Sequence, residues 1–368
     1  MTVIATERRG SDFARLSRRI VAAGLMDRRP SRYAAAIGLA LGVYAAGWAA
    51  FAAVGDSWWQ LAVAVLLAVG TTQVAFLGHD AGHRQMFRSR RASDAAGVLC
   101  GDLAVGLSYG WWVDKHNRHH ANPNHEDHDP DVGAGALVWT AKQAQSRSGL
   151  LRWMARNQAW LFFPLLTLEG LNLHVASVKA LFDVPMRRRG TEAVLLGLHL
   201  AGYLTAVFAM LPPAKALLFI AIHKGLWGVY MGCSFAPNHK GMPVLTADDR
   251  LDFLRKQVLT SRNVTGGPLV DVALGGLNYQ IEHHLFPSMP RPNLRRARPI
   301  VRQFCGENGI SYEETGLVGS YRQALRHLAS VGPGRGQPMP SALSSAGSGS
   351  TTSLVAGAST ETGEPKSE

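Results

Sequence analysis

The chain has 368 residues, a net charge of +12 at neutral pH and three widely spaced cysteines. Three cysteines predict no disulfide framework, and they are too few for an iron–sulfur cluster that requires four. Most of the excess charge is arginine near the ends of apolar blocks, which is typical of a membrane surface with anionic lipid. We therefore expect membrane lipid, and no nucleic acid, among the partners of this protein.

Four apolar segments are long enough to cross the hydrocarbon core of a bilayer, which is about 30 Å thick. Short links join them into two hairpins, and the segments lie at about 33–54, 58–78, 192–211 and 215–235. Residues 1–32 are polar and rich in arginine, and the lack of a small-residue cleavage site argues against a cleaved signal peptide. Arginine is concentrated on one side of the crossings, so the positive-inside rule predicts four spans with both termini in the cytoplasm.

Two weaker apolar stretches lie between the second and third spans. Residues 92–112 contain aspartates and glycines, and we expect a short helix in the membrane interface, with a full span as the alternative. Residues 160–173 are too short and too interrupted, by Pro164 and Glu169, for a clear span. Residues 332–368 have low complexity and are expected to be disordered, which leaves residues 33–331 as one membrane domain.

Histidine is concentrated in three short clusters outside the spans. The clusters are GHDAGH, KHNRHHA and NYQIEHH, and they contain His79, His83, His116, His119, His120, His283 and His284. If the second cluster is helical up to about Ala121, His116 and His120 share one helix face, with His119 beside them. Each cluster falls on the predicted cytoplasmic side of the spans, so the three can meet on one face of the membrane.

Seven histidines are more than the three or four ligands of one zinc site, which predicts a pair of metal ions. Imidazole suits iron, zinc and copper. HDAGH is similar to the HExxH of zinc proteases, but Asp80 stands where those enzymes have a glutamate base. A redox-active pair of irons fits better, because such a site activates dioxygen for attack on a C–H bond. Membrane spans and an apolar channel would then keep water away from the oxidant.

Other polar residues near the histidine clusters are expected to support the metal site or to lie in loops, and not to bind metal. Gln280 is expected to hydrogen-bond a metal ligand, because an amide oxygen is itself a weak ligand for iron. Asn263 is expected in a turn, with a water near a metal as the alternative. His125 and His128, with the aspartates around them, are expected to form a solvated loop that helps to orient ligand histidines.

Histidines and tryptophans near the spans leave alternatives open. His199 and His223 lie inside predicted spans, where ionisable groups are costly, and either a substrate channel or helix packing explains them. His174 is expected at the surface, with an approach to the metal site as the alternative. Trp111 and Trp112 precede the second cluster, where they either wall an acyl channel or anchor the chain at the interface.

The three clusters resemble the histidine boxes of the integral-membrane fatty acid desaturases. The matching boxes, in chain order, are HDAGH (79–83), HNRHH (116–120) and QIEHH (280–284). The resemblance runs from about Tyr33 to Leu328. Gln280 at the start of the third box is similar to the front-end subgroup, whose members insert a double bond between an existing one and the carboxyl end.

This resemblance implies an all-α membrane protein with four transmembrane helices, capped by a cytosolic helical domain that holds two irons. Some family members have an extra ligand just after the fourth span, and His239 in APNHKG matches that position. The resemblance thus implies eight iron-binding histidines, all of them on the cytoplasmic side.

The expected function is oxygen-dependent desaturation of long fatty acyl groups, with acyl-CoA or acyl-lipid as substrate and dioxygen as oxidant. The sequence contains neither an HPGG haem motif nor a flavin or nicotinamide fingerprint. Electrons are therefore expected from a separate donor, such as a ferredoxin, a cytochrome b5-like protein or a reductase. A hydroxylase with the same ligands is the first alternative. A non-enzymatic metal-binding or transport protein is the second, and it is disfavoured because transporters place polar residues at the midplane of their spans.

Overall fold

The computed structural model describes residues 11–334. Residues 1–10, and nearly all of the segment 332–368 that the sequence predicts to be disordered, lie outside the described residues. Within the described part, helices alternate with short loops, and a single pair of three-residue strands interrupts them. The predicted all-α class is therefore confirmed.

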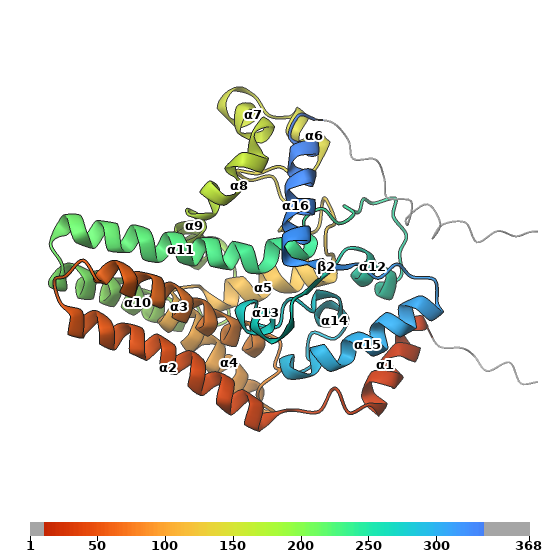
Figure 1. Ribbon diagram of the computed structural model, residues 1–368, viewed down its shortest axis with the longest axis horizontal. Coiled ribbons are helices and arrows are strands. Elements are labelled where there is room, and N and C mark those ends of the chain that lie inside the picture. The colour runs from red at the N-terminus through yellow and green to blue at the C-terminus, as the bar shows by residue number, and fades with distance from the viewer. Residues whose placement is uncertain (1–10, 335–368) are drawn as a thin grey trace, which may run out of the picture. The chain divides into compact units, whose positions relative to one another are not determined.

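Four long helices run alongside one another (Figure 1). They are α2 (Pro30–Val54), α3 (Gln60–Gly82), α10 (Arg189–Met210) and α11 (Pro213–His239). All four are long and apolar enough to cross a membrane, as predicted. A proline at the first position starts α2 and α11, where its missing N–H costs nothing.

The turn between α2 and α3 is closed by one buried side chain. The Gln60 amide donates to the carbonyl oxygens of Phe51 and Gly55, both at 2.8 Å. The last carbonyls of a helix have no partner inside it, so Gln60 satisfies two such groups at the end of α2. At their other ends, α3 and α11 continue past the predicted limits at residues 78 and 235, and these extra turns contain His79 and His239.

The single short helix expected over residues 92–112 is wrong. The chain forms α4 (Arg90–Val98), continues as a π-helical segment η1 (Leu99–Val105), and reverses before α5 (Tyr109–Ala121). Gly106 makes this reversal with a φ of 79°, a left-handed conformation that suits glycine. A Cβ at Gly106 would also lie 2.4 Å from the His199 ring, so no side chain fits there. The helix of the second histidine cluster ends at Ala121, as predicted.

Residues 141–183 form four helices that lead to the third long helix. They are α6 (Ala141–Gln145), α7 (Gly149–Arg156), α8 (Gln158–Leu166) and α9 (Glu169–Asp183). α8 and α9 are bent by 69° at the break between them, which makes the pair a broken span or a re-entrant loop by length and composition. The break follows Pro164 and precedes Glu169, the two residues that interrupt the apolar stretch in the sequence.

The remaining elements gather toward one end of the four long helices (Figure 1). They are α1 (Asp12–Ala22), α12 (Phe253–Leu259), α13 (Gly267–Ala273), α14 (Gln280–Leu285), α15 (Arg291–Glu307), α16 (Leu317–Val331), β1 (Asn263–Thr265) and β2 (Glu314–Gly316). The two strands pair in parallel, with Asn263 opposite Glu314. The turn expected at Asn263 is therefore wrong, because this residue begins a strand.

Candidate metal centre

The three histidine boxes and the end of α11 converge on one buried centre. In each of two groups, the ring nitrogens that face a common point lie within 4.8 Å of one another. The first group is His79, His83, His116 and His283, and the second is His119, His239 and His284. The structure thus brings together residues from α3, α5, α11 and α14 that are far apart in the chain.

His120 lies between the two groups. Its ring stacks on that of His284, with 4.2 Å between centroids, and lies 4.7 Å from the ring of His83. Its Nε2 is 3.1 Å from Nε2 of His116. All eight histidines proposed from the sequence therefore adjoin one another, and His120 connects the two groups.

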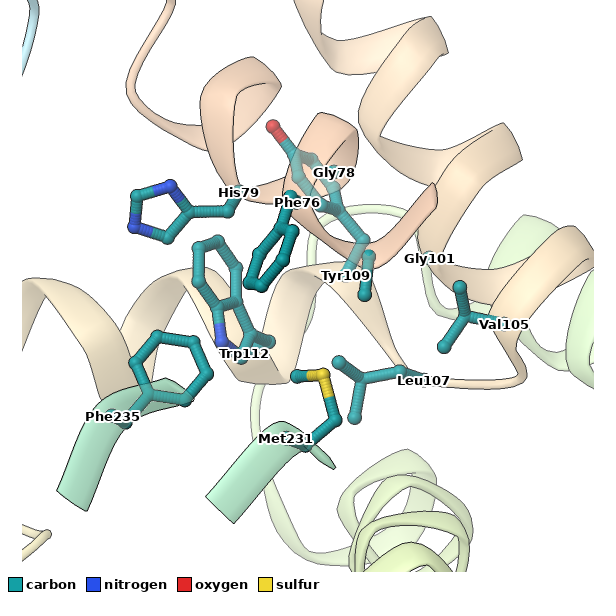
Figure 2. A pocket seen from close by; sticks show the side chains of 11 residues that line it. Phe76, Gly78, His79, Gly101, Val105, Leu107, Tyr109, Trp112, Met231 and Phe235 are labelled. Carbon is teal, nitrogen blue, oxygen red and sulfur yellow. The ribbon is translucent and has the colours of Figure 1, made fainter. Parts of the chain in front are cut away.

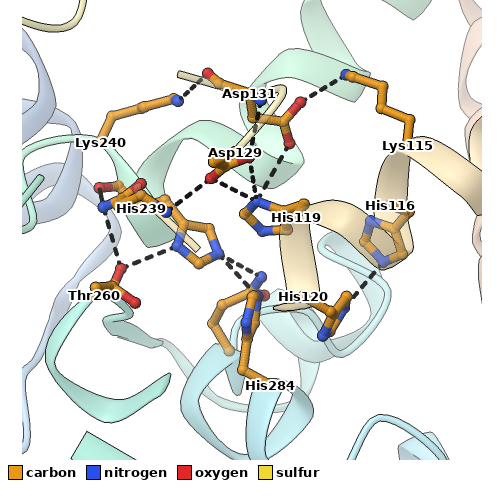
Figure 3. Close-up of polar contacts among 12 residues, drawn as sticks. Lys115, His116, His119, His120, Asp129, Asp131, His239, Lys240, Thr260 and His284 are labelled. Carbon is orange, nitrogen blue, oxygen red and sulfur yellow. Dashed lines mark hydrogen bonds and ion pairs between the residues drawn. The ribbon is translucent and has the colours of Figure 1, made fainter. Parts of the chain in front are cut away.

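The outward-facing nitrogen of several rings is held by a fixed acceptor (Figure 3). Nδ1 of His119 lies 2.9 Å from a carboxylate oxygen of Asp129, and Nδ1 of His239 lies 3.0 Å from the Thr260 carbonyl. Because a carboxylate or carbonyl oxygen only accepts, Nδ1 must carry the proton in both rings. This leaves the Nε2 lone pair facing the centre, which is the arrangement of metal-binding histidine.

Most of the inward-facing nitrogens face other imidazole nitrogens, although the Gln280 amide also reaches Nε2 of His239. Nε2 of His239 lies 3.1 Å from Nε2 of His284, and Nε2 of His83 lies 2.9 Å from Nε2 of His116. Within residues 11–334, both ring nitrogens of His283 are buried without a partner. An unpaired buried polar atom is costly, and a bound cation would satisfy all these lone pairs at once. The donor set therefore fits a metal site.

Burial keeps these rings in the form that binds metal. It lowers the pKa of His116, His120 and His283 well below the ordinary value of 6.5, and the neighbouring histidines lower it further. Neutral imidazole is the ligand form, so the rings are ready for metal at neutral pH.

Asp129 has the orienting role expected of its loop, but it has this role in a buried position that was not expected. A solvated loop was expected here, yet Asp129 is only 3% exposed. Besides holding His119, its carboxylate accepts from the backbone N–H groups of Asn124, at 2.7 Å, and Asp131, at 2.9 Å. The DPD sequence just after the second box is the one signal that pointed to it.

The charged and histidine side chains near Asp129 have other partners. Asp131 pairs with Lys115 at 2.6 Å, and although burial opposes the effect, this ammonium lowers the pKa of Asp131. His125 and His128 pack on each other, with 4.5 Å between ring centroids, and they belong to neither histidine group.

Gln280 and Asp80 both contact candidate ligands. Nε2 of Gln280 lies 2.9 Å from Nε2 of His239, in keeping with its expected hydrogen bond to a ligand. Asp80 is buried, lies 3.5 Å from Nδ1 of His79, and pairs with the Arg291 guanidinium at 3.2 Å. A carboxylate tied in this way is poorly placed as the free base that a zinc hydrolase needs.

The third box is fastened to β1 by a buried polar network. The two carboxylate oxygens of Glu282 accept from the Asn263 amide, at 2.8 Å, and from the Tyr312 hydroxyl, at 2.7 Å. The Asn263 side-chain oxygen accepts from the backbone N–H of Ile281, at 3.0 Å. Burial raises the pKa of Glu282 to about 7, although its two donors oppose the shift. These contacts hold the short helix that carries His283.

An apolar cavity of about 270 Å³ opens beside both histidine groups. His116, His119 and His239 line it, together with Trp111 and Trp112. Trp112 stacks on the His116 ring with 4.5 Å between centroids, so this tryptophan walls the cavity.

A small apolar recess lies next to His79 (Figure 2). Leu107, Trp112, Met231 and Phe235 line both the recess and the cavity, so the two spaces are neighbours. The cavity itself is lined by members of both histidine groups.

Three further histidines belong to neither histidine group, and they lie on α9, α10 and α11. His174 is 8% exposed and its Nδ1 lies 2.7 Å from the Gly106 carbonyl, so the surface position expected for it is wrong. His199 approaches the Leu103 carbonyl at 2.9 Å, and His223 approaches the Tyr203 hydroxyl at 2.9 Å. These contacts join neighbouring helices, which is the packing alternative for His199 and His223.

Comparisons with known proteins agree with this geometry. The family model described as fatty acid desaturase matches residues 56–316. An acyl-lipid (9-3)-desaturase of Physcomitrium patens is 31% identical over 284 residues, which cover 74% of this chain and 53% of the relative. The Delta(6)-fatty-acid desaturase fat-3 of Caenorhabditis elegans is 31% identical over 291 residues, which cover 74% of this chain and 65% of the relative.

A third relative covers more of the chain. An acyl-lipid 8-desaturase of Rebecca salina is 30% identical over 328 residues, which cover 87% of this chain and 74% of the relative. The chain spans between half and two thirds of the length of the two relatives described before it. The family model matches most of the chain, and the three boxes occur in the expected order and converge in the structure. The chain therefore belongs to the fatty acid desaturase family.

Proposed function

We propose that this protein is an oxygen-dependent desaturase of long-chain fatty acyl groups that works with two iron ions. The observation that carries the proposal is one cavity whose lining includes members of both histidine groups, His116 of the first and His119 and His239 of the second. When bound, two irons supply the chemistry that reduces dioxygen to water, with two external electrons and two protons, while two hydrogens leave adjacent methylenes.

The eight histidines are assigned as the iron ligands. His79, His83, His116 and His283 would hold one ion, and His119, His239 and His284 the other. His120 stands between them and is assigned to the centre as the eighth ligand. Asp129 and the Thr260 carbonyl orient two of these rings through Nδ1.

The cavity is assigned to the acyl chain. Trp112 and Phe235 line it, and members of both histidine groups line it too, so a chain in the cavity lies beside both groups. Their rings and the surrounding helices exclude water from the reacting methylenes. Lys115 and Lys240 line the same cavity and offer charged donors to the carbonyl end of an acyl-CoA or acyl-lipid.

The front-end type of desaturation is proposed from two observations. Gln280 begins the third box, and relatives at about 30% identity are named as Delta(6), Delta(5) and 8-desaturases. We place both termini and the metal centre on the cytoplasmic side, with the four long helices in the membrane. This orientation rests on the arginine distribution and the positive-inside rule. A separate protein, such as a ferredoxin, a cytochrome b5-like protein or a reductase, would deliver the electrons.

The test is a fatty acid profile of a host that expresses the protein and a matched electron donor. The host is fed a monounsaturated or diunsaturated acid, and gas chromatography–mass spectrometry locates new double bonds. We expect a new double bond on the carboxyl side of an existing one. We expect His120→Ala to abolish this product while the protein remains in the membrane, because it removes the ring between the two histidine groups.

His128→Ala is the matched control, because His128 is an exposed histidine eight positions further along the chain and outside both groups. We expect it to keep full activity. Retained product in His120→Ala would contradict the shared metal centre. A hydroxylated chain would reassign the protein to hydroxylation on the same scaffold. If the protein binds two irons but forms no new acyl product although the electron donor is active, the result would favour a non-enzymatic metal-binding protein.

A further inference from the structure

A groove of about 950 Å³ lies between α2, α3, α13 and α15. The described residues that line it are different from those that line the cavity and the recess beside the histidines. The groove is therefore a different site from the cavity assigned to the acyl substrate.

One wall of the groove is apolar and follows two membrane-spanning helices. Leu39 and Val43 of α2 and Val69 and Leu77 of α3 line this wall. The apolar lining residues of α2 extend from Ala36 to Val43, which is about 10 Å along a helix that rises 1.5 Å per residue. This length is about a third of a hydrocarbon core about 30 Å thick, so the groove accepts the part of a lipid tail nearest the head group.

α13 forms the opposite wall and exposes apolar side chains. Leu269 is 85% exposed and Val272 is 57% exposed. The helix is fixed in place because the Gln73 amide donates to the Val272 carbonyl, at 3.3 Å, and the Tyr230 hydroxyl donates to the Ala273 carbonyl, at 2.7 Å. A short helix held at the end of the spans with exposed apolar residues is typical of an element at the membrane surface.

The polar end of the groove is strongly positive. Its lining contains one carboxylate, that of Asp271, and five guanidinium groups, those of Arg29, Arg32, Arg291, Arg295 and Arg296. The start of α2 meets the start of α15 at this end, where Arg29 donates to the Asn293 side-chain oxygen at 2.9 Å. Figure 1 shows these two helix ends near each other.

The guanidiniums of two of the five arginines form no ion pair or hydrogen bond with another described residue. Arg291 pairs with Asp80, and Arg295 lies 3.6 Å from Asp271. Arg32 and Arg296 are exposed, and in the described part of the chain neither has an ion-pair partner. Two unpaired guanidiniums at the mouth of an apolar groove match the phosphate and the tail of a phospholipid.

We propose that this groove binds an anionic glycerophospholipid from the surrounding membrane. The phosphate lies between Arg32 and Arg296, and one acyl chain lies against Leu39, Val43 and Val69. A zwitterionic lipid offers less net negative charge to these arginines, and a soluble anion has no tail for the apolar wall. The anionic lipid is thus the occupant that uses both ends of the groove. The site is independent of the desaturase assignment.

The test compares lipid binding by the full-length, metal-loaded protein and its variants. Native mass spectrometry follows the lipid retained after purification in mild detergent, and titration with phosphatidylglycerol gives an affinity. We expect Arg32→Gln with Arg296→Gln to weaken phosphatidylglycerol binding by about tenfold or more, because two charge-assisted contacts are lost. Val69→Trp, which fills the groove from its partly exposed apolar side, should weaken binding with both arginines present.

The control is Arg322→Gln with Arg326→Gln, which removes the same charge from two exposed arginines of α16 that lie outside the groove. This variant should bind phosphatidylglycerol like the wild type. Iron content and Tm show that each variant is folded, and neither readout depends on turnover.

Three results would overturn the proposal. One is equal phosphatidylglycerol binding by the Arg32/Arg296 variant and the wild type. Another is equal binding of phosphatidylcholine and phosphatidylglycerol by the wild type. The third is displacement of the lipid by inorganic phosphate or acyl-CoA at comparable concentrations, which would make the groove a site for soluble anions.

Discussion

At the scale of single residues, a partner at the outward-facing nitrogen prepares three of the imidazoles for metal. Asp129 holds His119, the Thr260 carbonyl holds His239, and the Gln257 side-chain oxygen lies 2.9 Å from Nδ1 of His284. Each acceptor fixes the tautomer and the direction of the ring. The contribution of a histidine to the centre therefore depends on a second residue that carries no metal itself.

Asp129→Asn should lower the affinity for iron by about 10- to 100-fold, which is the usual effect of removing such a partner. The variant keeps a side-chain oxygen but loses the charge that favours the proton on Nδ1 of His119. Iron retained against a graded series of chelator concentrations measures the change. Asp127→Asn, in an exposed position of the same loop, should leave the affinity unchanged. Equal retention by the two variants would remove Asp129 from the support of the centre.

At the scale of elements, the third box depends on contacts from outside its own helix. α14 has only six residues, and a helix of this length is not stable alone in water. Asn263 on β1 and Tyr312 just before β2 hold Glu282, so the strand pair and the helix are joined by one buried carboxylate. Asn263 thus supports the centre by fixing α14.

Tyr312→Phe should lower both Tm and iron affinity, because it leaves the buried Glu282 carboxylate with one donor fewer. The loss of such a partner costs about 1–3 kcal/mol. Differential scanning calorimetry and iron retention are the two measurements. Tyr321→Phe removes a hydroxyl that donates to the Cys233 carbonyl at 2.6 Å, away from the third box. It should lower Tm but leave iron affinity unchanged, and a parallel loss of iron in this control would contradict a specific role for Tyr312.

At the scale of the whole molecule, eight neutral imidazoles are collected in the interior from four helices. Without metal, Nε2 of His79 and both ring nitrogens of His283 are a cost to the folded state, because they are buried with no hydrogen-bond partner among residues 11–334. Bound metal converts this cost into stabilisation, since it binds the folded chain and not the unfolded one. Folding and metal binding are therefore coupled.

Removal of metal should lower Tm and make stability depend on pH. In the folded chain the pKa values of His116, His120 and His283 lie well below 6.5, whereas the unfolded chain has the ordinary value. As pH falls below about 6.5, the unfolded state binds protons that the folded state does not, so stability is lost by up to about 1.4 kcal/mol per pH unit per group. Chemical unfolding of chelator-treated protein between pH 7.5 and 5.5 measures this. A free energy of unfolding that stays constant over this range would contradict the prediction.

The four long helices and the three boxes were predictable from the sequence alone, and the second-box helix ends at Ala121, as assumed for its spacing. Each of these depends on the length of an apolar run or on a spacing within one or two helical turns, which covalent neighbours fix. The tertiary structure decided the reversal at Gly106, the burial of His174 and the role of Asp129. The first two follow from packing between segments far apart in the chain. The third depends on a loop that folds back over α5, and the local pattern of charged residues did not distinguish this loop from a solvated one.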